Sequence, residues 1–321
     1  MADIIQVIFN TDFFFTTIRV MTPVLYAAMA CMVFYKGGVD AIGTEGIMLL
    51  CSLAGVLGGY FTGSAFLGVV IAFAAGAFFA CLYTFVVLRL GSEAILAGIA
   101  LNTLASGLTI FVLYYVTGEK GSTQSLNSPV CPSIDIPILK DIPILGDILS
   151  GHNILTYVAV LLVIVLFFLI YKTPTGLRIR TVGENPQAAR SVGIHVRKYR
   201  YLTSIIAGGL AGMGGAFMSM AYVSNFSREM IAGRGYIGMA AEGMGRGTPL
   251  GVLLSSIIFG AADSLATRLQ MLNVPARLVQ ALPYAITIIA IAIYSYIRTQ
   301  RKAKNSSGAG AAAEAAGKKG T

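Results

Sequence analysis

Few residues of this chain carry side chains that could act as catalysts or metal ligands. There are two histidines, His152 and His195, and four scattered cysteines, three of them inside apolar runs. No CxxC or HExxH spacing occurs, so we expect no metal centre and no structural disulfide. The stretch Gly317-Lys318-Lys319 has the wrong spacing for a phosphate-binding loop and lacks the hydroxyl that follows the lysine. The sequence therefore predicts no catalytic residues and no cofactor bound by this chain.

Ionisable groups within apolar runs are functional candidates by default. Four acidic residues qualify: Glu45, Glu93, Glu242 and Asp263. The first two lie at predicted helix starts, where a carboxylate is stabilised by the helix dipole. The third could pair with Arg246, and the fourth with Thr267 or Arg268. A structural role is therefore sufficient for all four.

The most informative local motif lies in the polar segment 176–194. Asn185 is a favourable N-cap, Pro186 suits the first helical position, and Gly193 is a natural stop. The motif predicts a helix of about two turns, which is too short to be stable alone in water. It must therefore dock on another surface, and a force applied to it would move the apolar segments on both sides.

Composition places these elements in a membrane. Hydrophobic residues make up 56% of the 321 residues and charged residues 12%, whereas soluble domains have about 25% charged residues. The mean hydropathy is +0.78. Apolar segments fill the chain from end to end, which excludes a soluble enzyme with one anchor, a disordered protein and, despite the net charge of +9, a nucleic-acid-binding module. We expect an all-α polytopic membrane protein.

Nine apolar runs are candidates to span a bilayer, which takes about 20 residues. Five are free of charge: 65–88, 94–117, 153–171, 202–227 and 278–297. Four are shorter, richer in glycine or carry an ionisable group: 18–35, 46–61, 231–244 and 250–265. The run 231–244 is short enough to be a partial or tilted span. We expect a transmembrane domain over residues 1–298 and a disordered basic tail over residues 299–321.

The positions of lysine and arginine predict the orientation. Segment 172–200 holds seven basic residues against Glu184 alone, and residues 298–321 add six more, so both should be cytoplasmic. The loop 118–151 has four acidic residues against two lysines and should lie outside. Nine crossings then place the N-terminus outside, the C-terminus inside and Arg246 at a cytoplasmic turn.

Internal similarity and glycine spacing indicate how the helices pack. The stretch 46–94 resembles the stretch 235–276 in its order of glycine-rich helix, turn and apolar run. The predicted orientation places the two stretches in opposite directions across the membrane, which favours an inverted repeat of the kind found in transporters. Small residues four apart occur at Gly208 and Gly212, at Ala211 and Gly215, and in the row Gly55, Gly59 and Gly63. Such pairs allow close helix contact in lipid, and they could also form a surface along which helices slide between two states.

Several motifs together resemble the permeases of bacterial ABC importers for sugars, nucleosides and branched-chain amino acids. Segment 176–194 resembles the cytoplasmic coupling loop of that family. The stretch 41–48 resembles its asparagine-isoleucine-glycine motif, although Ala41 replaces the usual asparagine. Similar matches occur at 92–102, 232–237, 245–251 and 282–284. They cover residues 23–296 in the family's order, and the resemblance is closest to guanosine-type nucleoside permeases.

The resemblance implies a type II ABC-importer-like bundle in the cytoplasmic membrane that moves a solute by alternating access. A separate ABC ATPase, expected to be double-headed, would bind ATP and Mg²⁺, and an extracytoplasmic lipoprotein would deliver the solute. A second, longer permease would complete the complex. The residues implied in coupling to the ATPase are Gly183, Glu184, Asn185, Pro186, Ala188, Ala189, Arg190, Val192 and Gly193. Of these, Ala188, Ala189 and Val192 would pack in a groove on the ATPase.

The solute path is expected to contain Asn102, Ser106, Tyr114, Tyr222, Asn225 and Phe226. A nucleoside requires amides for the edges of its base and an aromatic face for stacking, which Asn102 with Tyr114 or Phe226 would supply. Hydrogen bonding between helices is the alternative role for the polar members. Two other functions stay open: a sugar or branched-chain amino acid permease of the same fold, and an ion-coupled transporter that needs no ATPase.

Overall fold

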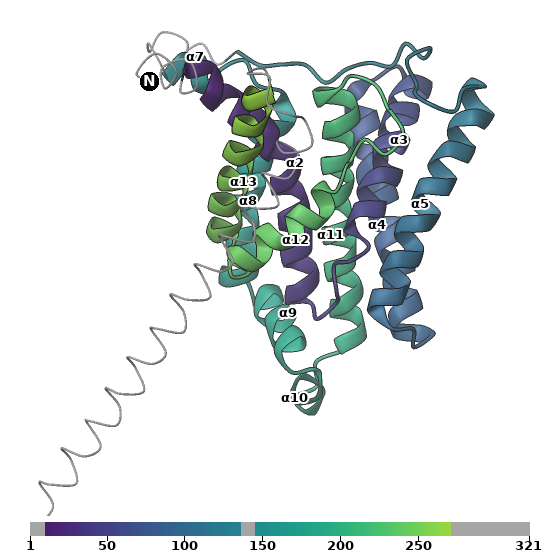
Figure 1. The fold of residues 1–321 in the computed structure, drawn as a ribbon. Helices are drawn as coiled ribbons and strands as arrows, with labels where there is room; N and C mark the ends of the chain where they lie inside the picture. The colour runs from purple at the N-terminus through teal and green to yellow at the C-terminus, as the bar shows by residue number, and fades with distance from the viewer. Residues whose placement is uncertain (1–9, 136–144, 271–321) are drawn as a thin grey trace, which may run out of the picture.

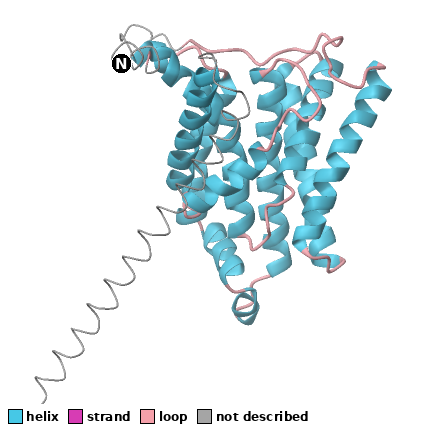
Figure 2. Ribbon diagram, in the orientation of Figure 1, coloured by secondary structure: helices cyan, strands magenta, loops and turns pink. Residues whose placement is uncertain are grey.

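The computed structural model describes residues 10–135 and 145–270, and every regular element within them is a helix (Figures 1 and 2). The first part contains α2 (Thr11–Lys36), α3 (Thr44–Thr62), α4 (Ala65–Arg89) and α5 (Ala94–Thr117). The second contains α7 (Leu145–Leu149), α8 (Ile154–Lys172), α9 (Pro174–Glu184), α10 (Pro186–Ser191), α11 (Val196–Phe217), the π-helix η1 (Met218–Tyr222), α12 (Arg234–Met244) and α13 (Pro249–Gln270).

Seven helices in these ranges are long and apolar enough to cross a membrane: α2, α3, α4, α5, α8, α11 with η1, and α13. They match seven of the nine predicted runs. Helix α12 has 11 residues and is about 16 Å long, which is too short for a hydrocarbon core of about 30 Å. The predicted run 278–297 and tail 299–321 lie outside the described residues, so the count of nine stays a prediction.

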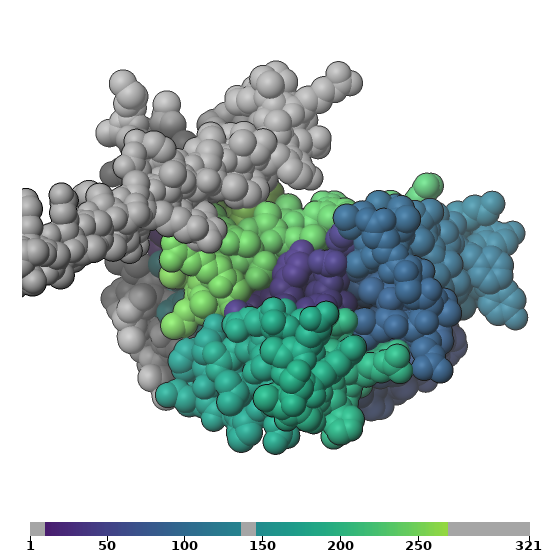
Figure 3. Space-filling view, turned by 90° about the horizontal axis from the view of Figure 1, so that it is seen from below, coloured from purple at the N-terminus to yellow at the C-terminus, as the bar shows by residue number. Residues whose placement is uncertain are grey.

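The bundle has two distinct ends (Figure 1). Helices α9 and α10 project from one end, which we call the elbow end. The connecting segment 118–135 covers the opposite end, which we call the loop end. Seen from the elbow end (Figure 3), segment 174–200 forms a rounded surface beside α12 and α13, and atoms of the first part of the chain lie between them.

Helix α2 is the centre of the bundle. In its most apolar 18-residue window 89% of the residues are buried, and it packs against α13, α11 and α12. A helix that is apolar on all sides is expected in such an interior position. Helix α12 approaches it closely at Gly238, because a Cβ at that position would collide with the Cβ of Ala27.

Glycines bring α11 and α4 into backbone contact. A Cβ on Gly208 would collide with the carbonyl of Gly76, and one on Gly212 with the carbonyl of Ala72. The predicted pair Gly208 and Gly212 is therefore a close-packing surface. Gly63 does not share the close packing of Gly55 and Gly59, because a Cβ at Gly63 would meet no atom within 4 Å. It follows the last residue of α3 with a left-handed φ of 67°.

Two connecting segments turn inside the bundle and determine where α3 and α12 begin. Segment 37–43 folds back along α2, so that the hydroxyl of Thr44 lies 3.6 Å from the sulfur of Cys31, about 7 Å before the end of α2. Segment 223–233 leads inward from η1 to α12, which passes α2 at Ala27 and ends near Lys36. Segment 223–233 and α12 together occupy the place of the crossing predicted for 231–244, which stays a prediction, and Arg246 follows the end of α12 near Lys36.

Candidate functional site

The elbow end is built from two consecutive capped helices. The hydroxyl of Thr173 accepts a 3.0 Å hydrogen bond from the N–H of Gly176, and Pro174 occupies the first turn of α9. The side chain of Asn185 accepts hydrogen bonds from the N–H groups of Gln187 and Ala188 at 3.1 and 3.0 Å. The predicted N-cap of α10 is thus confirmed. Helix α9 was not predicted, although Thr173 followed by Pro174 is a recognisable start signal.

Helices α9 and α10 and the start of α11 form a unit that we call the elbow, and a small apolar core holds it together. It consists of Ile179, Val182, Ala189, Val196 and Tyr199, contributed by α9, α10 and α11. Ala189 is fully buried in this core, so its methyl group cannot enter a groove on another protein. The docking that the short α10 requires is therefore provided, on this side, by the chain itself. The reason is the helical period, which turns Ala189 away from its neighbours Ala188 and Arg190.

The other predicted coupling residues lie at the surface or at the junction with α2. Glu184, Asn185, Ala188, Arg190, Val192 and Gly193 are exposed, and Pro186 is half-buried. Val192 is 72% exposed, a high value for a valine. Gly193 has a φ of 80°, which suits glycine. Gly183 packs so closely on the end of α2 that a Cβ would collide with the carbonyl of Lys36.

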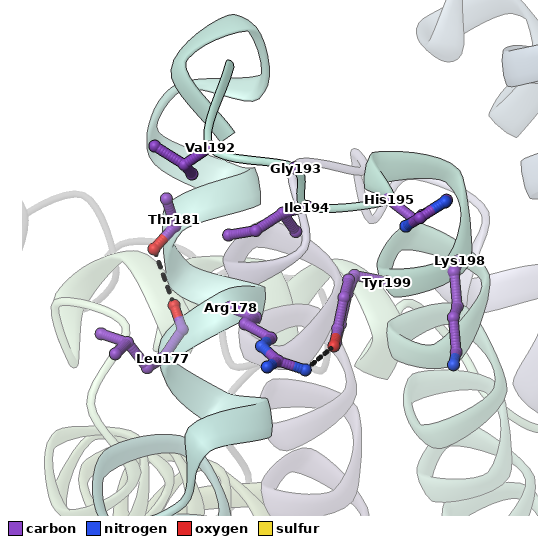
Figure 4. A pocket seen from close by; sticks show the side chains of 9 residues that line it. All are labelled: Leu177, Arg178, Thr181, Val192, Gly193, Ile194, His195, Lys198 and Tyr199. Atoms are coloured by element: carbon purple, nitrogen blue, oxygen red, sulfur yellow. Dashed lines mark hydrogen bonds between the residues drawn. The ribbon is translucent and has the colours of Figure 1, made fainter. Parts of the chain in front are cut away.

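A basic pocket opens beside α10 (Figure 4). Its volume is about 530 Å³, and Val192 and Ile194 contribute apolar walls. Arg178 and Tyr199 point toward each other across it, and the guanidinium donates a 2.9 Å hydrogen bond to the tyrosine oxygen. His195 and Lys198 line the same pocket. The exposed face of the elbow therefore combines apolar and basic groups.

The second feature lies inside the bundle, where α3 and α12 begin. The carboxylate of Glu45, in the first turn of α3, accepts hydrogen bonds from the N–H groups of Gly233 and Gly235 at 2.8 and 2.7 Å. Glu45 therefore has the predicted structural role, but the helix start it stabilises is that of α12. A carboxylate at a helix N-terminus is favoured by the helix dipole.

Asn102 belongs to the same junction. Its amide oxygen accepts a 2.8 Å hydrogen bond from the N–H of Gly46, and its nitrogen donates to the carbonyl of Ile42 and the hydroxyl of Tyr236. These three bonds join α5 to α3, to the segment 37–43 that precedes it and to α12. They favour the interhelical role for Asn102 over contact with a solute.

The other predicted solute-path residues differ in burial and position. Tyr114 is 52% exposed and lies 12 residues beyond Asn102 on α5, about 18 Å away along the helix. Phe226 is fully buried, and its N–H donates to the hydroxyl of Thr123. These positions do not support the predicted pairing of Asn102 with Tyr114 or Phe226, which stays a prediction. Ser106 and Asn225 are half-buried.

Tyr222 is the predicted path residue with the most unusual surroundings. The guanidinium carbon of Arg19 lies 4.9 Å from its ring centroid and that of Arg234 lies 5.8 Å away. Arg19 also donates a 2.9 Å hydrogen bond to the carbonyl of Tyr222. Sequence reasoning considered only acidic residues within the spans and missed Arg19. A basic residue inside an apolar run was the available signal.

Comparison with known proteins identifies the family. The family described as "Branched-chain amino acid transport system / permease component" matches residues 13–291. The chain belongs to this permease family. The permease is 32% identical over 286 residues to the nucleoside ABC transporter permease protein NupC of Lactococcus lactis, covering 85% of this chain and 89% of NupC. It is 33% identical to the guanosine ABC transporter permease protein NupQ of Bacillus subtilis, covering 86% and 89% of the two chains.

A third relative and two solved structures extend the comparison. The permease is 31% identical to the putative glucose ABC transporter permease protein TsgC13 of Haloferax volcanii, with 88% and 91% of the two chains covered. A putative metal-chelate type ABC transporter in an inward-facing conformation has a similar fold, with a TM-score of 0.51, 18% identity and 89% and 87% coverage. PsaBC from Streptococcus pneumoniae gives a TM-score of 0.52 at 13% identity, with 90% and 94% coverage.

These findings establish the class of the protein. The permease is a multi-pass protein of the cytoplasmic membrane and a component of an ABC transporter rather than an enzyme. Membership of this family implies a partner ATPase.

Proposed function

We propose that the chain is the permease subunit of an ATP-driven importer for nucleosides. The nucleoside assignment is supported by the relatives NupC and NupQ, which match over most of the chain at 32% and 33% identity. The observation that carries the ATP-driven mechanism is the elbow, in which the capped helices α9 and α10 connect the spanning helices α8 and α11, and α9 packs against the end of α2.

The elbow is suited to receive a force from a separate motor. Its own core fixes α10 to α9 and α11 through Ala189, while Ala188, Arg190 and Val192 face outward. A partner that grips this outer face would move α8 and α11 together, because α9 follows α8 after a single residue and α10 leads into α11. The contact between Gly183 and Lys36 would pass the same motion to the central helix.

In this proposal the elbow end faces the cytoplasm and the loop end faces outward. Seven basic residues in segment 172–200 support that orientation by the positive-inside rule. A ninth crossing by 278–297 would then return the C-terminus to the cytoplasmic side. A membrane-impermeant thiol reagent should label Val192→Cys only from the cytoplasmic side, in a variant without the native cysteines.

The arrangement of α3 and α12 supports the proposed inverted repeat. Both helices begin inside the bundle after a segment that turns back, and their starts meet at Glu45 and Gly235. From there α3 runs toward the loop end, where Ser128 contacts Val56, and α12 runs toward Lys36. Helix starts that meet inside the bilayer are a feature of transporter cores.

The proposed partners are a double-headed ATPase that binds ATP and Mg²⁺, a second and longer permease, and a lipoprotein that delivers the nucleoside. Reconstituting the four proteins in liposomes and measuring uptake of labelled guanosine, glucose and leucine tests this. We expect guanosine uptake that requires ATP and stops when the P-loop lysines of the ATPase are replaced by alanine. Uptake of glucose or leucine instead would assign the transporter to another solute, and guanosine uptake without the ATPase would indicate an ion-coupled carrier.

A further inference from the structure

A cavity of about 250 Å³ lies near the loop end, between α2, α8 and α11. It is slightly smaller than the range of about 300–1,000 Å³ for sites that enclose a whole drug-sized ligand, so it suits one planar ring with the rest of a molecule outside. Its lining combines aromatic, polar and cationic groups: Phe15, Arg19, Ser133, His152, Asn153 and Thr156. The rings of Phe15 and His152 are stacked at 4.2 Å.

Arg19 supplies the charge of this cavity. It is the ninth residue of α2 and therefore lies about 12 Å inside the helix. Its side chain is exposed, and among the described residues no acidic side chain forms an ion pair with it. A guanidinium has five N–H donors, of which one bonds to the carbonyl of Tyr222. A cation within a membrane span that, among the described residues, uses one of its five donors indicates a functional role.

Tyr222 fixes the position of that guanidinium. It offers both its carbonyl and its ring to Arg19, and its ring also lies near the guanidinium of Arg234. Tyr222 ends the π-helix η1, an element that is frequent at functional sites. Ser224, two residues later, has a φ of 66°, a strained conformation for a residue with a side chain. The backbone on both sides of Tyr222 is therefore irregular.

We propose that this cavity binds the base of a 6-oxopurine nucleoside and that Arg19 donates two parallel N–H groups to O6 and N7. This inference rests on the proposed nucleoside transport. A 6-oxopurine such as guanine presents two neighbouring acceptors to an arginine fork, whereas adenine presents one acceptor and one amino donor. The stacked rings of Phe15 and His152 provide an aromatic wall for the base, and Tyr222 is a positioning residue for Arg19.

The sharpest probe is 7-deazaguanosine, which keeps O6 but has a C–H in place of N7. Uptake of guanosine and of 7-deazaguanosine is measured with the reconstituted wild-type complex and with Arg19→Lys, which keeps the charge but cannot form the fork. The guanosine preference is the ratio of guanosine uptake to 7-deazaguanosine uptake. The same binding protein is present throughout, so its own preference cancels when this ratio is compared between wild type and Arg19→Lys. We expect the guanosine preference to fall at least about fivefold in Arg19→Lys, the lower end of what a bidentate contact contributes.

Two further variants make the result decisive. Tyr222→Leu keeps the backbone carbonyl but removes the ring, and we expect the guanosine preference to fall in it as well. Arg89→Lys, at an exposed arginine that ends α4, is the matched control and should leave the preference unchanged. An unchanged preference in Arg19→Lys, or an equal loss of uptake of both nucleosides, would show that Arg19 is structural. If the wild-type complex takes up no nucleoside at all, the proposed function fails, which is a different outcome.

Discussion

The carboxylate of Glu45 accepts a 2.7 Å hydrogen bond from the backbone N–H of Gly235, 190 residues further along the chain. The same carboxylate accepts a second bond from Gly233, so one side chain caps the start of α12 from the first turn of α3. A capping group on a different helix makes the two helix starts dependent on each other. Any motion that separates α3 from α12 must break these bonds.

Glu45→Ala should destabilise the protein because it leaves the N–H groups of the half-buried Gly233 and the buried Gly235 without their acceptor. We expect a loss of about 2–3 kcal/mol, the value for hydrogen bonds to a charged group, and a smaller loss for Glu45→Gln. The chain has no tryptophan, so unfolding is best followed by a thiol-reactive dye that reports exposure of the buried Cys31 and Cys51. Glu93→Ala is the control, since Glu93 precedes α5 without a side-chain cap. Equal stability of Glu45→Ala and wild type would contradict the capping role.

The contact between α11 and α4 should not tolerate a single methyl group. Gly208→Ala would place a Cβ against the carbonyl of Gly76 and the Cβ of Ala80, and we expect a loss of about 1–3 kcal/mol from overpacking. Gly107→Ala is the matched control, because nothing lies near Gly107 and alanine favours the helix. The unfolding temperatures of both variants are measured in the same detergent. We expect a lower unfolding temperature for Gly208→Ala than for Gly107→Ala, and equal values would contradict the close contact at Gly208.

Substitutions at the adjacent residues Ala188 and Ala189 should affect uptake and stability differently, because one side chain is exposed and the other is buried. Ala188→Glu places a charge on the exposed face of α10 and should abolish ATP-dependent uptake with little change in stability. Ala189→Glu places the charge in the small core of the elbow and should destabilise the protein before any partner is involved. Co-purification of the ATPase, together with thermal unfolding, separates the two effects. Normal uptake and normal ATPase binding in both Ala188→Glu and Val192→Glu would exclude this face as the docking surface.

His152 should make the loop end less stable in acid. Burial lowers the pKa of its imidazole, and the nearby Arg19 guanidinium lowers the pKa further, although a hydrogen bond that its Nε2–H donates to the carbonyl of Ile148 acts in the opposite direction. In the unfolded chain the imidazole takes up a proton as the pH falls through about 6.5, while in the folded protein it still resists protonation. Stability should therefore decrease as the pH falls below that value.

The measurement is the unfolding temperature at pH 7.5 and pH 5.5 for wild type and for His152→Phe, which keeps the stacking on Phe15. We expect a larger fall in the wild type. Equal falls in the two proteins would assign the acid sensitivity to other groups.

Local features of the sequence were sufficient to predict the described membrane helices, the start of α10 and one close-packing surface. Long apolar runs predict membrane helices because a bilayer demands about 20 apolar residues regardless of what they pack against. The start of α10 was predictable for the same kind of reason, since Asn185 caps a helix whose first residue follows it directly. The use of Gly208 and Gly212 for packing follows from spacing along one helix face.

Contacts between distant segments decided the rest. Only the tertiary structure showed that Ala189 lies in the core of the elbow and that Phe226 is buried. Only the tertiary structure placed Arg19 beside Tyr222 and Glu45 beside Gly235, residues about 200 positions apart. The physical reason is that in lipid the polar groups of a helix bundle must find partners on other helices, and a pattern along one segment does not specify which distant segment provides them.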